Sequence, residues 1–193
     1  MTVELRPSEA EVIFLNLAYN KFYDIHEEVS NDTFWEKSPQ YRFQRIKNAF
    51  EIYSEILNYE PVKWVIESIK EKRPPMEGGV GSELFKCIRN MLSHFPFFDS
   101  WNEVWVNKSL VNWYKKGQTI DKFFVKYIGK EDIKYRIWDA NNRQMSYVTI
   151  SFPKEYNDKN KIYLKDILPE REGLKFSFTL MRRIIDTQVL YEG

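Results

Sequence analysis

Apolar residues recur at every third or fourth position through most of the first hundred residues, and this spacing constrains the fold most. Side chains three or four positions apart lie on one face of an α-helix, so each such run predicts a helix with a buried side. Ser8 opens a capping-box sequence, and Ser38 precedes Pro39 as an N-cap residue precedes a proline in the first helical turn. We therefore predict helices over residues 8–30 and 38–58.

The same spacing predicts two more helices before residue 97. A third helix is expected over residues 60–72, and the prolines and glycines of residues 73–79 then predict a loop. Ser82 is a candidate N-cap for a fourth helix, which Pro96 helps to end. The apolar side of this fourth helix carries Leu84, Phe85, Ile88, Met91, Leu92 and Phe95.

The next thirty residues give a mixed signal. Trp101 and Trp105 suit a helix, whereas the sequence of residues 104–106 suits a short strand equally well. The apolar residues of segment 119–127 return to helical spacing. A short helix is therefore expected there.

Beyond Gly129 the apolar spacing changes to two, which is the period of a β-strand. Alternating residues over 133–137 and 148–152 flank a turn at Asn141 and Asn142, so the sequence predicts a hairpin. Residues 161–164 are a candidate third strand beside it.

Helical spacing returns between about residues 168 and 190. The chain of 193 residues is long enough to bury a core of its own. We therefore predict one domain over residues 1–193 with a mainly α fold. It would be a helical bundle with a small antiparallel β insertion at about residues 130–165.

Composition limits the classes of partner and location. Lysine and arginine number 29 against 28 aspartates and glutamates, so the total charge does not steer the chain to nucleic acid or membrane, and anion binding needs a local patch. No signal peptide and no membrane-spanning run is expected from the apolar pattern. The single cysteine fits a reducing cytoplasmic location, although it fits other compartments too.

The polar side of the fourth helix carries three groups that are unusual together. Asn90 and His94 are four positions apart and therefore share a face. Arg89 lies about 140° around the helix from His94 and roughly 7.5 Å along its axis, a gap that its long side chain can bridge. One helix thus presents a cation, an amide and an imidazole to the same region of space.

The six residues from Arg89 to His94 resemble the Arg-x-x-x-x-His signature of the HEPN superfamily, in the form with a polar second residue that its ribonucleases carry. The resemblance covers the motif helix directly and the earlier helices more loosely. It implies a HEPN-like helical bundle and an endoribonuclease that needs no metal and no cofactor. In that reaction the ribose 2′-hydroxyl attacks the adjacent phosphorus and leaves a 2′,3′-cyclic phosphate and a free 5′-hydroxyl.

The resemblance also implies roles for the three residues. His94 would move protons, Arg89 would stabilise the charge on the phosphoryl oxygens, and Asn90 would orient the histidine or donate to a phosphate oxygen. Further RNA contacts are expected from the following residues: Lys86, Ser93, Arg136 and Arg143. On the hairpin, Tyr135 and Trp138 could add to them, although an ordinary solvated strand face explains that region equally well.

Partners follow from the resemblance as well. The family typically places two such motifs face to face across a two-fold axis, so a homodimer with a composite site is implied. Families of this kind usually act in toxin–antitoxin or antiviral defence systems, which implies RNA as substrate and an antitoxin or other inhibitor protein as partner. A cytoplasmic location without a membrane partner agrees with this role.

Each residue also has a plain structural interpretation. His94 could interact with the C-terminal end of the helix dipole, Arg89 could pair with Glu83 or Asp99, and Asn90 could cap a loop. Two alternatives to the ribonuclease are therefore a HEPN-like scaffold that binds a nucleotide or a protein without chemistry, and a structural interaction module in which Arg89 is only an ion-pair partner. His26 is expected to be an exposed or half-buried helix residue, and Cys87 a packing residue.

Overall fold

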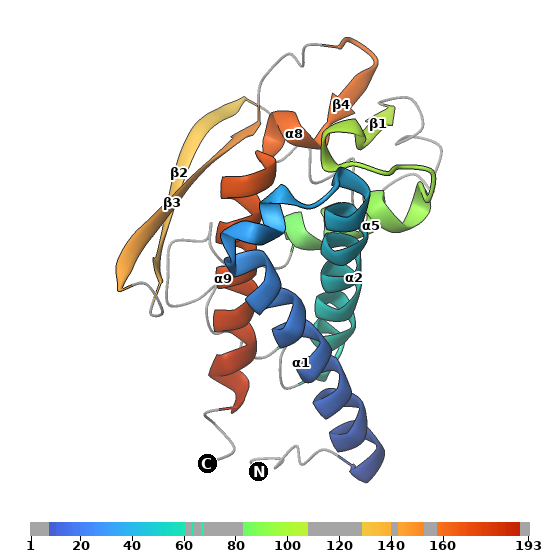
Figure 1. The fold of residues 1–193 in the computed structure, drawn as a ribbon, viewed down its shortest axis with the longest axis vertical. Helices are drawn as coiled ribbons and strands as arrows, with labels where there is room; N and C mark the ends of the chain where they lie inside the picture. The colour runs from blue at the N-terminus through green and yellow to red at the C-terminus, as the bar shows by residue number, and fades with distance from the viewer. Residues whose placement is uncertain are drawn as a thin grey trace.

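The computed structural model in Figure 1 describes residues 8–60, 63, 67, 83–107, 129–139, 143–152 and 158–189. Three long helices, α1 (Glu9–Ser30), α2 (Pro39–Leu57) and α9 (Glu170–Val189), form the body of the protein, and the short helix η1 (Asp32–Glu36) joins α1 to α2. Helix α5 (Phe85–His94) packs on α2. The fold is mainly α with small antiparallel sheets, as the sequence predicts.

The first two helices begin where their capping residues predict. The Ser8 backbone nitrogen donates to Glu11 Oε2 at 2.7 Å, and Ser8 Oγ accepts from the Glu11 nitrogen at 3.4 Å. Ser38 Oγ accepts from the backbone nitrogen of Tyr41 at 3.3 Å, with Pro39 in the first turn. Both caps satisfy backbone donors that the first helical turn leaves without partners, which confirms these two predictions.

The core is centred on Phe50 of α2, which is fully buried. Its ring lies 5.7 Å from that of Phe85, 6.3 Å from Trp101 and 6.4 Å from Phe178, measured between ring centroids. Trp101 belongs to the short helix η3 (Trp101–Glu103), and its indole nitrogen donates to the Leu168 carbonyl at 3.0 Å. Helices α2, α5, η3 and α9 therefore meet around one phenylalanine.

The predicted hairpin is present and covers part of α9. Strand β2 (Lys130–Asp139) pairs antiparallel with β3 (Gln144–Phe152), and both strands contact α9. Ile150 and Phe152 are buried on the side that faces the bundle. Figure 1 shows the hairpin as a separate layer beside α9.

The strand predicted at residues 161–164 is present, but its expected place beside this hairpin is wrong. Strand β4 (Lys161–Tyr163) instead pairs antiparallel with β1 (Trp105–Asn107), and the two form a second sheet. For the segment around residue 105 the sequence left a helix and a strand open, and the structure shows a strand at residues 105–107. Pairing joins segments far apart in the sequence, so strand spacing alone cannot choose between possible partners.

The C-terminal helix starts slightly later than predicted. A short helix, α8 (Leu164–Ile167), follows β4 directly, and Leu168 and Pro169 separate it from α9. Five other predictions lie outside the described residues: the helix over 61–72 apart from residues 63 and 67, the loop at 73–79, the cap at Ser82, the helix at 119–127 and the turn at Asn141–Asn142.

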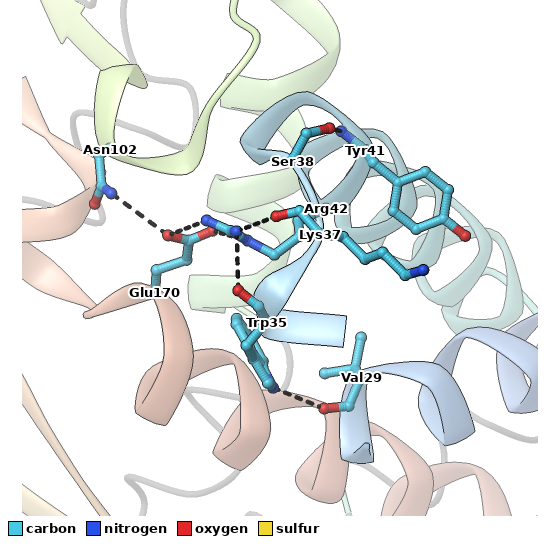
Figure 2. Close-up of polar contacts among 8 residues, drawn as sticks. All are labelled: Val29, Trp35, Lys37, Ser38, Tyr41, Arg42, Asn102 and Glu170. Carbon is cyan, nitrogen blue, oxygen red and sulfur yellow. Dashed lines mark hydrogen bonds and ion pairs between the residues drawn. The ribbon is translucent and has the colours of Figure 1, made fainter. Parts of the chain in front are cut away.

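Arg42, in the first turn of α2, binds the end of η1 and the start of α9 (Figure 2). Its Nε donates to Glu170 Oε1 at 3.1 Å, and its Nη1 donates to the backbone carbonyls of Trp35 at 3.1 Å and Lys37 at 2.6 Å. Asn102 also donates to Glu170, at 3.4 Å. The start of α2, the end of η1, the start of α9 and η3 are therefore held by one guanidinium and one carboxylate.

Replacing Arg42 with alanine should lower the free energy of unfolding by about 2–3 kcal/mol, because charge-assisted hydrogen bonds are lost and Glu170 keeps a charge in a side chain that is only 16% exposed. Urea unfolding followed by circular dichroism measures the change. Arg171→Ala is the matched control, because its ion pair with Asp32 is exposed and Lys175 also holds that carboxylate. Equal midpoints for the two variants would contradict the prediction.

Candidate active site

Helix α5 has an apolar side in the core and a polar side at the surface. Phe85, Ile88, Met91 and Leu92 are fully buried against the bundle. The opposite side, which we call the polar stripe, carries residues at positions i, i+3, i+4, i+7 and i+8, and these share one helix face. The members of the polar stripe are Lys86, Arg89, Asn90, Ser93 and His94.

Arg89 and Asn90 contact each other within the polar stripe. Arg89 Nη1 donates to Asn90 Oδ1 at 3.2 Å, and the arginine side chain is 33% exposed. Its Nε is buried and has no hydrogen-bond partner within the described part of the chain. The contact with Asn90 is thus made by an outer nitrogen of the guanidinium, while the buried Nε makes none with the described residues.

Two carboxylates of α2 border the polar stripe, and the sequence analysis did not identify them. Glu55 Oε1 lies 3.5 Å from Arg89 Nη2, and Ser93 Oγ donates to Glu51 Oε1 at 3.3 Å. Glu51 and Glu55 are four positions apart, so their shared face is readable from the sequence. Which side of α2 faces α5 depends on how the two helices pack. The spacing of residues within one helix does not predict that packing.

His94 is the last residue of α5 and is exposed to solvent. It stands one turn beyond Asn90 on the polar stripe. Three residues later the ring of Phe97 is also exposed, at 65%, and it packs on Phe98 with 4.6 Å between ring centroids. This exposed ring near His94 was missed because the phenylalanines of residues 95–98 look like core residues from their composition.

The structure brings five of the predicted site residues together and leaves two apart. All five members of the polar stripe lie on α5, which packs on α2. Arg136 and Arg143 belong to the hairpin and its turn, and the hairpin packs on α9. Any RNA contact at these two arginines would therefore lie on a different surface from the polar stripe.

Cys87 and His26, which were not expected to take part in the site, are both buried. Cys87 lies in the core, as predicted. His26 is only 4% exposed and lies 6.2 Å from the ring of Phe22, so the prediction of an exposed or half-buried side chain is wrong. Its neighbours Glu27 and Glu28 suggested a solvated segment, but the helix turns His26 to the same side as Phe22.

Burial raises the pKa of the Cys87 thiol to about 12, and it raises the pKa of the Tyr53 phenol as well. In an unfolded chain these groups lose their protons near pH 8.5 and pH 10. Their stabilising contribution is therefore complete below about pH 8.5 and is lost as the pH rises, because only the unfolded chain then ionises. We expect the thermal midpoint to fall between about pH 8.5 and 11.

Scanning calorimetry over this pH range measures how steeply the thermal midpoint falls as the pH rises. The Tyr53→Phe variant should show a shallower fall, because one ionising group is removed. Slopes that are equal in the two proteins would contradict this prediction. The Cys87 thiol should also react with a disulfide reagent only when the protein unfolds, since the thiolate is the reactive form.

No group of three or more histidine, cysteine, aspartate or glutamate side chains that could hold a metal ion is found among the described residues. Nor does any helix in the described ranges have the length and apolar character needed to cross a membrane. The protein is therefore mainly helical and carries an arginine, an asparagine amide and a histidine on one partly exposed helix face. No protein-family model, curated protein or solved structure matches the chain.

Proposed function

We propose that this protein is a metal-independent endoribonuclease whose catalytic residues are Arg89, Asn90 and His94. One observation carries the proposal: these three side chains share a partly exposed helix face on which Arg89 is already bound to Asn90. A phosphodiester can approach such a face from solvent. The resemblance of residues 89–94 to the HEPN ribonuclease motif supports the same assignment.

The chemistry follows from the three side chains. The 2′-hydroxyl oxygen attacks phosphorus, the bond from phosphorus to the 5′-oxygen breaks, and a 2′,3′-cyclic phosphate forms. His94 exchanges the protons, because an imidazole can both accept and donate near neutral pH. The Arg89 guanidinium remains charged and stabilises the negative charge that grows on the phosphoryl oxygens. Asn90 holds Arg89 in place through its amide oxygen.

Two copies of the chain would complete the site. One imidazole can accept the 2′-hydroxyl proton while a second gives a proton to the leaving 5′-oxygen, and one chain supplies one polar stripe. We therefore propose a homodimer with a composite site, held in check by an inhibitor protein and acting on RNA in the cytoplasm as a toxin or antiviral effector. Mixing wild-type chain with His94→Ala chain tests this: activity should follow the square of the wild-type fraction, and a linear fall would exclude a shared site.

The direct test is incubation of the purified chain with total RNA in EDTA, followed by mapping of the new ends. The expected products carry 2′,3′-cyclic phosphates and 5′-hydroxyls. Cleavage that requires added metal, products with 3′-hydroxyl ends, or no cleavage at all would overturn the proposal.

A second candidate function is a scaffold that binds without catalysis. The contacts of Arg89 with Glu55 and of Ser93 with Glu51 favour it, since they would also serve to attach α5 to α2. A scaffold predicts no cleavage in EDTA and no effect of the wild-type to His94→Ala ratio on any activity.

Replacing Glu55 with glutamine should increase the affinity for RNA up to about fivefold. The carboxylate competes with phosphate for Arg89 Nη2 across 3.5 Å, and an exposed pair of this kind is worth about 0–1 kcal/mol. Fluorescence anisotropy with a labelled RNA, in a His94→Ala background that prevents cleavage, measures the change. Glu27→Gln removes an exposed charge from α1 and is the control. A loss of affinity in Glu55→Gln would mean that the carboxylate positions Arg89 instead of competing for it.

A further inference from the structure

The hairpin has an inner face and an outer face that the pairing register defines. Ile150 and Phe152 are buried on the inner face. Side chains alternate along a strand, so Met145 and Tyr147 of β3 lie on the opposite, outer face. Register places Trp138 opposite Met145 and Arg136 opposite Tyr147, which puts all four residues on the outer face. We call these four residues the hairpin face.

The hairpin face is unusually apolar for a surface in water. Trp138 is 52% exposed, Tyr147 is 61% exposed and Met145 is 36% exposed. An antiparallel sheet that covers a core with one face normally carries polar residues on the other. The inner face already supplies the contact with α9, so the fold does not need these rings outside.

The charge around these rings is positive. Arg136 is exposed opposite Tyr147, and Arg143 is exposed at the hairpin turn, where its φ of 48° supports the reversal of the chain. None of the hairpin side chains that the structure describes on this face or at the turn is acidic. The face therefore offers aromatic rings together with cations.

We propose that the hairpin face binds single-stranded RNA, with bases stacked on Trp138 and Tyr147 and phosphates bound by Arg136 and Arg143. The two rings occupy diagonal positions, which lie roughly 7–8 Å apart in an antiparallel pair, so each can take its own base. Stacking on aromatic side chains beside a positive groove is how proteins hold single strands without reading sequence. A duplex keeps its bases stacked internally and offers none to these rings.

A protein partner fits the hairpin face less well. Stable protein interfaces bury about 800 Å² on each side, whereas two strands about 4.8 Å apart present only a narrow strip.

The hairpin face is separate from the polar stripe within one chain. The hairpin packs on α9 and α5 packs on α2, and Figure 1 shows the hairpin on the far side of α9 from α2. The choice of RNA as ligand rests on the proposed ribonuclease function. In that function the hairpin face would hold a part of the RNA away from the bond that is cut, so it should affect KM and leave kcat unchanged.

Anisotropy of a short labelled single-stranded RNA tests the proposal, using the full chain in a His94→Ala background. Replacing both Trp138 and Tyr147 with serine should weaken binding at least about tenfold, because two stacking surfaces are removed. Replacing both with phenylalanine should preserve most of the affinity, because the rings remain. Arg136→Ser should weaken binding and make it less sensitive to salt. The control is Ile13→Ser with Leu17→Ser, which removes exposed apolar side chains from α1 and should change nothing.

Equal affinity of the serine variant and the unaltered hairpin would overturn the proposal, as would tighter binding of a duplex than of the single strand. A serine variant that keeps its RNA affinity but changes the molecular mass in solution would identify the hairpin face as a protein interface instead. Cleavage by the chain with His94 intact is scored separately. Binding at the hairpin face without cleavage would remove only the ribonuclease assignment, and cleavage without any effect of Trp138 and Tyr147 would remove only the hairpin proposal.

Discussion

Replacing His94 with alanine should lower kcat for RNA cleavage by about 10²–10⁴-fold, the range expected when a group that transfers protons is removed. The side chain is exposed at the end of α5, so its loss should leave the fold intact. RNA affinity should change little, since Arg89 remains to bind phosphate. Initial rates with a fluorogenic RNA, together with thermal melts of both proteins, provide the measurement.

Two further variants serve as the control and the comparison for His94→Ala. Asn48→Ala changes an exposed polar residue on α2 and should keep full activity. Arg89→Lys keeps the charge but loses the planar fork, so it should retain RNA affinity better than it retains kcat. Full activity in His94→Ala would exclude the imidazole from catalysis, and a large fall in its melting temperature would point to a structural role.

The helices are predictable from the sequence because their signals are local. The bonds that cap α1 and α2 join residues three positions apart, and the polar stripe follows from the period of the helix alone. These features do not depend on where the rest of the chain lies. The starts of α1 and α2, and the face on which Arg89, Asn90 and His94 stand, therefore follow from the order of the residues alone.

Features that depend on packing could not be predicted in this way. Strand β4 pairs with β1 across more than fifty residues instead of joining the hairpin. Glu55 reaches Arg89 only because α2 presents that side to α5. On the hairpin, the register places Tyr147 of β3 opposite Arg136 of β2. Each of these contacts joins separate elements, and the apolar spacing within one element carries no information about them.

The two functional proposals differ in the same way, because one uses residues of a single element and the other uses residues of two. The catalytic proposal uses side chains of one helix, and their relative positions are set by helical geometry. The hairpin proposal uses two strands, and their register brings Trp138 and Tyr147 to one face. A change in the packing of the bundle would therefore move the hairpin face relative to α5 but would leave the polar stripe intact.

The packing itself depends most on Phe50, and replacing it with alanine should lower the free energy of unfolding by about 3–5 kcal/mol. The ring is fully buried and touches aromatic rings of α5, η3 and α9, so its loss leaves a cavity where these elements meet. A domain of this kind has only about 5–15 kcal/mol of stability in total. Urea unfolding, with the slope checked for two-state behaviour, measures the loss.

Phe97→Ala is the matched control, because it removes the same side chain from a site that is 65% exposed. It should cost about 1 kcal/mol or less, mainly through its contact with Phe98. Phe50→Leu should fall between the two, since leucine fills part of the cavity. If Phe50→Ala were no less stable than Phe97→Ala, the four elements could not meet at Phe50. The packing of α5 against α2 at this ring would then have no support.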